Sequence, residues 1–353
     1  MKKKKMLFIG SLPTKKVHFN GETNKTGDIY KILKKSGRCR ITKINLTHFK
    51  LFNTFKMIFC VMLRRYHSVF ISKCVVGGSF AIHLILKFGL KQNRKNIYFY
   101  WIGNGTLGLE HKKMFLNEIE KCRCVIFESD AVRLDHQDLN IKSYLIIPCI
   151  KPKYDLKVLE KDYSSVSTLK CIYFSRICEQ KGLMDAIKAV EKANKIIGLK
   201  AFSLDIAGAP TSDEARAFEL KMLDYIKDKN DTFTYFGRSF CVTGLETYKR
   251  LQDYDLHLFP SHFKQECVPG SVVDMFIAGV PTVSSSFKNV FNLLSENDSF
   301  IFEQGSIESF VQTLLSIYKE KNKLNSFRVK SNNLKSLYDE DAFINAVQSI
   351  CLI

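Results

Sequence analysis

Long apolar runs are absent from this 353-residue sequence. No stretch approaches the 18 or more apolar residues of a membrane-spanning helix. Four lysines precede the apolar residues Met6 to Leu12, but Gly10 and Ser11 interrupt this run, which is too short for the core of a signal peptide. We therefore expect no spanning segment and no leader. We expect a first β-strand here, in a cytoplasmic protein.

Cysteines are present, but without the spacing of disulfide frameworks or zinc sites. The eleven cysteines are odd in number, and one residue separates the closest pair, Cys122 and Cys124. This pattern favours reduced thiols in a cytosolic protein. We expect no metal and no other cofactor.

Acidic residues are outnumbered by basic ones. The chain has 54 Lys and Arg against 35 Asp and Glu, a formal net charge of +19. Such a balance predicts affinity for nucleic acid, an anionic membrane surface or phosphorylated substrates. Zinc-finger and RNA-recognition signatures are missing, so we expect no nucleic-acid partner.

The order of the expected elements indicates an α/β protein. Strand-like and helical patterns alternate in the second half, and less regularly in the first, which predicts parallel sheets with helices on both faces. The expected strands are residues 6–9, 40–45, 69–72, 97–100, 125–127, 144–147, 171–174, 202–207, 232–236, 255–259, 281–283 and 299–302. The expected helices are residues 26–35, 80–86, 112–121, 183–197, 213–227, 245–251, 271–278 and 307–318.

The chain length suits two domains. The polar segment 151–168 is the natural linker, so we expect domains at 1–165 and 166–353, with the last helix packing back on the first domain. Two doubly wound, Rossmann-like domains would face each other across a cleft. Such open sheets bind ligands beyond the carboxyl ends of their strands.

The segment from Glu266 to Pro281 places two carboxylates around a tight turn and a helix start. Helix formation is expected from Ser271, and free N–H groups there attract a phosphate. Glu266 precedes this turn and Asp274 lies one helical turn inside. In the alternative interpretation, Ser271 and Asp274 form a capping box that serves only the helix.

Two cations flank an expected strand-to-helix loop. Arg176 and Lys181 have four residues between them and could converge on one pyrophosphate, or could be a solvated basic loop. Gly208, Gly237 and the segment 261–266 each follow a further expected strand. All of these residues are therefore expected on one rim of the second sheet.

These motifs occur in the order found in the retaining family 4 glycosyltransferases, which the sequence resembles. Glu266 and Asp274, with seven residues between them, are similar to the family's E-x7-E element, with Asp in place of the second Glu. The segment Pro269 to Asp274 resembles a bacterial capsule and polysaccharide subgroup. The resemblance implies a GT-B fold and transfer of a hexosyl group from a nucleotide sugar to a lipid-linked or growing glycan acceptor. It also implies retention at the anomeric carbon, without a metal, in surface polysaccharide biosynthesis.

The resemblance also implies roles for individual residues. Glu266 would be catalytic and Asp274 would hold the ribose. The donor phosphates would contact Arg176, Lys181, Gly270, Ser271 and, from the other domain, Gly21. The donor sugar would contact Cys267, Val268 and Pro269. The base would be bordered by Gly208, Tyr235, Phe236 and Gly237.

The sequence departs from the family pattern at two places. Cys267 and Val268 replace the usual Gly-Phe, and Ile102 replaces a His before Gly103, so no catalytic histidine is assigned. A sugar-nucleotide epimerase of the same architecture and a non-catalytic polyanion- or glycan-binding homologue are the alternatives.

The segment 49–70 mixes phenylalanines and aliphatic residues with Lys56, Arg64 and Arg65. This composition is that of an interfacial helix that lies on an anionic membrane, or of an ordinary buried helix with solvated lysines. The first interpretation predicts a peripheral protein on the inner leaflet of the plasma membrane.

Overall fold

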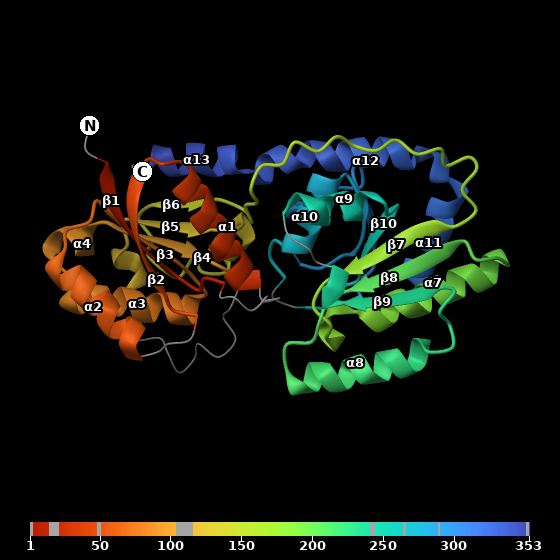
Figure 1. Cartoon of the computed structure of the whole chain (residues 1–353), viewed down its shortest axis with the longest axis horizontal. Helices are drawn as coiled ribbons and strands as arrows, with labels where there is room; N and C mark the ends of the chain where they lie inside the picture. The colour runs from red at the N-terminus through yellow and green to blue at the C-terminus, as the bar shows by residue number, and fades with distance from the viewer. Residues whose placement is uncertain are drawn as a thin grey trace. The chain divides into compact units, whose positions relative to one another are not determined.

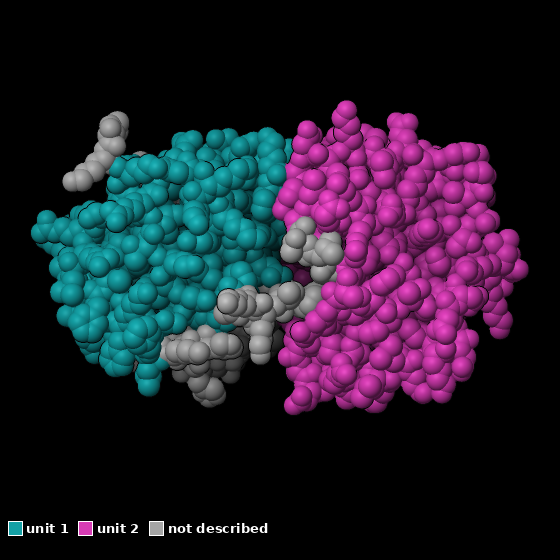
Figure 2. All heavy atoms as spheres, in the orientation of Figure 1, with its two compact units in different colours: residues 1–153, 336–353 teal, residues 154–335 magenta. Residues whose placement is uncertain are grey.

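The computed structural model describes residues 3–13, 21–47, 51–103, 116–240, 244–263, 266–288, 290–350 and 353. The chain forms two compact units (Figure 2). Unit 1 consists of residues 1–153 and 336–353, and unit 2 of residues 154–335.

Unit 1 contains a sheet of six parallel strands in the order β2-β1-β3-β4-β5-β6. The strands are β1 (Lys4–Gly10), β2 (Cys39–Asn45), β3 (Ser68–Lys73), β4 (Ile97–Trp101), β5 (Cys124–Phe127) and β6 (Tyr144–Ile146). β3, β4 and β5 are buried along their whole length, as the continuous apolar runs of a two-sided parallel sheet require. The strands expected in the first half are confirmed.

The helices of unit 1 cover both faces of this sheet (Figure 1). They are α1 (Gly21–Lys35), α2 (Leu51–Leu63), α3 (Val75–Phe88), α4 (Lys91–Lys95), α6 (Asp130–Leu134) and α13 (Glu340–Ser349). α1 and α13 share one core cluster with inward residues such as Phe70, and α3 packs on the opposite face. The helix expected at 112–121 lies partly outside the described residues, and the described part holds the α-helical residue Leu116 and the 3-10 turn Ile119–Lys121.

The C-terminal helix α13 belongs to unit 1. Phe343 and Val347 are fully buried in its core, and the Tyr98 hydroxyl donates to the Ile350 carbonyl at 3.1 Å. Unit 1 otherwise ends at Lys153, before the boundary expected at residue 165. The reason is that the next residues pack on unit 2, where Tyr163 is buried in the core.

Unit 2 repeats the architecture with strand order β12-β11-β10-β7-β8-β9, all parallel. The strands are β7 (Leu169–Phe174), β8 (Phe202–Ala207), β9 (Phe233–Gly237), β10 (Leu256–Phe259), β11 (Thr282–Ser285) and β12 (Phe300–Phe302). The helices are α7 (Leu183–Ile197), α8 (Asp213–Ile226), α9 (Leu245–Gln252), α10 (Gly270–Ala278), α11 (Ile307–Lys319) and α12 (Leu324–Asn333). The elements expected here are confirmed, and α12 was missed.

The helices of unit 2 divide between the two faces of its sheet (Figure 1). α7, α8 and α11 supply one core, which includes Leu183 and Phe310, and α9 and α10 supply the other, which includes Leu251 and Met275. The chain leaves β7 toward β8 on one side and later adds β10 on the other, so the strand order reverses between β7 and β10. Ligands of doubly wound sheets bind at such a reversal. The predicted pair of Rossmann-like doubly wound sheets is therefore confirmed.

A buried histidine in β10 makes the stability of unit 2 depend on pH. His257 is fully buried, and burial lowers its pKa to about 3. Its Nε2 has no hydrogen-bond partner among the described residues. Because the folded pKa lies below the unfolded value near 6.5, the unfolded chain binds one more proton between these two pH values. Stability is therefore lost as the pH falls below about 6.5.

We expect His257→Leu to flatten this dependence. Between pH 6.5 and 5, where most carboxylates stay ionised, the extra loss of the wild type should steepen from about 0.7 to about 1.4 kcal/mol per pH unit. Urea unfolding at a series of pH values measures the difference. Equal slopes for both proteins would contradict the prediction.

Candidate functional site

The candidate site lies at the carboxyl ends of β7 and β10, where the strand order of unit 2 reverses. The loop 175–182 follows β7, and the segment 260–269 follows β10 and leads into α10. Both loops are held close by their backbones, since the N–H of His262 donates to the carbonyl of Gln180 at 2.8 Å. The loops that the sequence predicted for one rim therefore meet there.

Two glycines permit this close approach. Gly182 has φ +69°, in the left-handed region, and a Cβ there would collide with the carbonyl oxygen of Pro260. A Cβ on Gly208, after β8, would collide with the carbonyl oxygen of Ser175. The close packing of these loops therefore requires glycine at positions 182 and 208.

Glu266 is buried at the centre of this rim. Its carboxylate forms an ion pair with Lys181 and accepts a hydrogen bond from the Ser261 hydroxyl at 2.8 Å. All three side chains are buried: Glu266 is 7% exposed, Lys181 6% and Ser261 0%. A buried carboxylate held by a cation and a hydroxyl keeps one orientation, because any other would leave the charges unpaired.

Further contacts fix the residues around Glu266. The Ser261 carbonyl accepts from the Ser285 hydroxyl at 2.7 Å and from Gln304 Nε2 at 2.8 Å. The ammonium of Lys181 lies 5.4 Å from the ring centre of Phe259 and 5.2 Å from that of Phe263. These two rings shield the ion pair and favour its cation.

Arg176 lies on the same rim, half-buried, and its guanidinium makes no hydrogen bond or ion pair with the residues that the structure describes. Burial raises the pKa of the neighbouring Tyr173 well above its usual range; the charge of Arg176 opposes this rise and that of Glu266 adds to it. The charges of Arg176 and Glu266 therefore both act on the Tyr173 hydroxyl. Arg176 offers an uncommitted bidentate donor for an anion.

Helix α10 begins four residues after Glu266. Its N-cap is Pro269, which makes no side-chain capping bond, and Ser271 lies inside the helix, so the capping box with Ser271 as N-cap is wrong. Asp274 instead accepts a hydrogen bond from the Tyr248 hydroxyl at 3.0 Å. The N–H groups of Gly270 and Ser271, in the first turn, have no partner within the helix.

The remaining predicted residues of unit 2 border this rim. Cys267, Val268 and Pro269 are buried between Glu266 and α10. The Tyr235 hydroxyl donates to the Gly208 carbonyl at 3.4 Å and also contacts Glu219, and Gly208 donates its N–H to the Gly237 carbonyl at 3.0 Å. Burial and the Glu219 carboxylate raise the pKa of Tyr235.

Phe236 is partly exposed beside Phe240, with ring centres 5.9 Å apart. In unit 1, Gly21 is the exposed first residue of α1.

Two polar contacts near the candidate site of unit 2 were not predicted from the sequence. The pairing of His262 with Asp185 joins the segment after β10 to the first turn of α7. Tyr248 contacts Asp274 from α9. Neither partner could be found from spacing, because each contact joins residues of different elements.

Unit 1 carries a second cluster at the corresponding place, the reversal between β1 and β3. Ser11 donates to Glu22 at 2.7 Å, and Lys73, 5% exposed, contacts both, at 2.9 and 3.3 Å. Beside it, buried Glu128 accepts from Lys25 at 2.5 Å and from the N–H of Gly103 at 2.8 Å. These side chains are not among the site residues predicted from the sequence.

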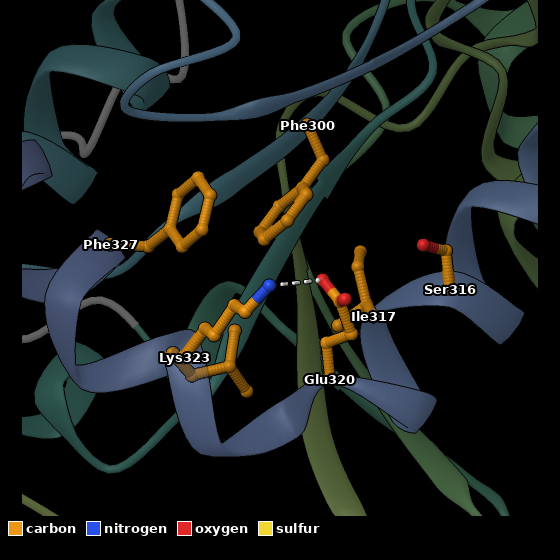
Figure 3. Close-up of a pocket in the computed structure, with 7 residues that line it drawn as sticks. Phe300, Ser316, Ile317, Glu320, Lys323 and Phe327 are labelled. Atoms are coloured by element: carbon orange, nitrogen blue, oxygen red, sulfur yellow. Dashed lines mark ion pairs between the residues drawn. The ribbon is translucent and has the colours of Figure 1, made fainter.

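A pocket of unit 2 lies away from the rim (Figure 3). It has a volume of about 150 Å³, between the amino end of β12 and helices α11 and α12. Figure 3 shows its stacked Phe300 and Phe327 rings and the Glu320–Lys323 ion pair of 3.0 Å. None of the predicted site residues lines it.

Two kinds of feature are absent from the described ranges. No group of three or more His, Cys, Asp or Glu side chains is placed to hold a metal ion. No helix is long and apolar enough to cross a membrane.

Two doubly wound sheets, with cations and a helix N-terminus at the strand reversal of the second, define the GT-B class of fold. Residues 168–320 match the family model described as glycosyl transferases group 1. This segment, which contains nearly the whole rim, is therefore similar to that family.

Solved structures share the fold at low sequence identity. TarM from S. aureus is 16% identical with a TM-score of 0.64; the match covers 84% of this chain, which spans 58% of the length of TarM. Anabaena HepE in complex with UDP-glucose is 13% identical with a TM-score of 0.68 and is covered over 98% of its length by 99% of this chain.

WaaB, a lipopolysaccharide outer core galactosyltransferase, is 13% identical with a TM-score of 0.62, and 98% of this chain covers 99% of it. The sequence matches none of the curated proteins with which it was compared. At these identities the structural likeness establishes the fold.

We expect Gly182→Ala to damage the rim more than a change at a matched glycine. Gly198 has φ +80° with open space around its Cβ position, so Gly198→Ala should cost only the left-handed strain, about 1–2 kcal/mol. Gly182→Ala adds a backbone collision and should cost about 2 kcal/mol more. Urea unfolding of both variants measures the difference, and equal losses would show that the rim accommodates a methyl group.

Proposed function

We propose that the chain is a retaining glycosyltransferase that moves a hexosyl group from a nucleoside diphosphate to a glycan acceptor. The observation that carries this proposal is the buried Glu266 carboxylate, which Lys181 and Ser261 hold at the strand reversal, four residues before the N-terminus of α10. The family match over residues 168–320 supports it.

The donor diphosphate binds between the β7 loop and α10. The N–H groups of Gly270 and Ser271 and the positive end of the helix dipole receive phosphate oxygens. Arg176 supplies a bidentate contact, and Lys181 adds a second positive charge next to Glu266. Charge that develops on the leaving diphosphate is stabilised by these fixed groups, and they supply the counter-charge that a metal would otherwise provide.

Glu266 contacts the hydroxyls of the donor sugar and stabilises the reacting centre on the face that retention requires. Cys267, Val268 and Pro269 form the wall beside that sugar, and their bulk selects which sugars fit. Asp274, oriented by the Tyr248 hydroxyl, accepts from the ribose hydroxyls. Gly208, Tyr235, Phe236 and Gly237 border the base.

We assign the acceptor to unit 1, at the cluster of Ser11, Glu22 and Lys73. Hydroxyls of a sugar match such alternating donors and acceptors, and the strand reversal favours a ligand there. The proposed acceptor is a lipid-linked or growing surface glycan. The proposed process is bacterial surface polysaccharide biosynthesis at the inner leaflet. The likeness to WaaB, which acts on lipopolysaccharide outer core, supports this class.

We expect Glu266→Gln to abolish transfer while nucleotide binding persists. The amide keeps the shape of the side chain but loses the charge, so kcat should fall by at least about 100-fold. Glu214→Gln, an exposed change at the start of α8, is the control and should leave kcat unchanged. Release of nucleoside diphosphate in the presence of acceptor glycans measures the rate, and NMR of the product tests retention.

Unchanged transfer by the Glu266→Gln variant would contradict the catalytic assignment. Donor turnover by the wild type without any acceptor would favour an epimerase instead. Nucleotide or glycan binding without any turnover would favour a binding homologue.

We expect Arg176→Gln to weaken binding of the diphosphate selectively. A charged hydrogen bond of this kind corresponds to about a tenfold to hundredfold change in Kd. Calorimetry with UDP, the nucleotide bound in several structures of the same fold, should show this rise, whereas uridine should bind equally to both proteins. Lys188→Gln, on the exposed side of α7, is the matched control. Equal loss of uridine affinity would indicate that Arg176 contacts the nucleoside.

A further inference from the structure

Helix α2 of unit 1 carries a row of exposed apolar side chains. Its exposed apolar residues are Leu51, Phe52, Phe55, Phe59, Met62 and Leu63, with exposed fractions from 43% to 76%. At about 100° per residue they fall within an arc of about 120°, which we call the α2 apolar face. Met57 and Val61, on the opposite side, are fully buried. A continuous exposed apolar face of this size marks an interaction surface.

The sequence stretch that contains this face has no acidic residue. Residues 29–109 contain fifteen Lys and Arg and not one Asp or Glu. Lys56, Arg64 and Arg65 belong to α2 or follow it directly, and all three are exposed. The long-range field beside the apolar face is therefore positive.

A short helix brings more cations to the same end of α2. Asn93 in α4 is fully buried and donates to the carbonyls of Val61 at 2.8 Å and Arg64 at 2.7 Å. The N–H of Leu90 also donates to the Val61 carbonyl, at 2.9 Å. These bonds fix α4 against the C-terminal end of α2, and Figure 1 shows the two helices in unit 1. The exposed cations that α4 adds are Lys91, Arg94 and Lys95.

We propose that the α2 apolar face docks on the surface of an anionic lipid bilayer. The phenylalanines would enter the boundary between headgroups and acyl chains, and the flanking cations would contact lipid phosphates. Apolar insertion and charge attraction add to each other only on an anionic leaflet. A second copy of the chain fits poorly, since a symmetric pair would bring the same cations together.

This docking goes beyond the proposed transfer reaction and explains how a lipid-linked acceptor would be reached. It is also independent of that reaction, because the nucleotide residues belong to unit 2. Failure of nucleotide binding and failure of membrane docking are therefore separate results.

Vesicle co-sedimentation tests the proposal with the full chain. Phosphatidylcholine vesicles, with and without phosphatidylglycerol, are the probes. We expect the wild type to bind the anionic vesicles, less tightly at high salt. The variant Phe52→Ser/Phe55→Ser/Phe59→Ser should bind about tenfold more weakly per phenylalanine. The variant Arg64→Gln/Arg65→Gln should bind about fivefold more weakly per arginine, on the anionic vesicles only.

Matched controls lie on unit 2. Ile196→Ser/Leu199→Ser removes exposed apolar side chains and Lys188→Gln/Lys195→Gln removes exposed charges, and both should bind as the wild type does. An unchanged thermal midpoint confirms that each variant is folded. Binding that ignores lipid charge, or that the α2 variants do not change, would overturn the proposal. So would a dimer that the phenylalanine variants dissociate without any effect on vesicle binding.

Discussion

The buried ion pair between Lys181 and Glu266 is the interaction on which the candidate site depends. It joins the loop after β7 to the segment after β10, and both charges are almost fully removed from water. Removing one partner would leave an uncompensated buried charge, at a cost of about 3–5 kcal/mol. The ion pair therefore fixes the Glu266 carboxylate beside α10. An anion bound next to Lys181 would compete for the same ammonium group and so affect the position of that carboxylate.

The fold prepares this position with backbone contacts. Gly182 and Gly208 allow two rim loops to touch neighbouring carbonyls, which no other residue type could do without displacement. Unit 1 uses its strand reversal in the same way, with Lys73 between Ser11 and Glu22. In both units the same sheet topology places a buried lysine against a carboxylate at the end of a strand, so a common architectural rule provides two polar sites in one chain.

Much of the fold and of the candidate site was predictable from local sequence. The remainder depends on contacts between residues that are distant in the sequence. Every expected strand formed, and α7 matched its predicted range. The reason is that hydrophobic periodicity and helix-terminating residues such as Gly198 act locally. The order of the rim motifs also indicated the glycosyltransferase likeness that the family match over residues 168–320 supports. The capping box failed because Pro269, and not Ser271, precedes the helix. The bond from Tyr248 to Asp274 could not be predicted, because it depends on tertiary packing between two helices.

The placement of α13 affects how the protein is made. Unit 1 draws Phe343 and Val347 into its core, yet these residues are synthesised after all of unit 2. A ribosome that has just finished β6 therefore holds a unit whose hydrophobic core is still open. Unit 2, which is continuous in sequence, can close first. During synthesis the core of the N-terminal unit is consequently completed only after the C-terminal residues of the chain have been made.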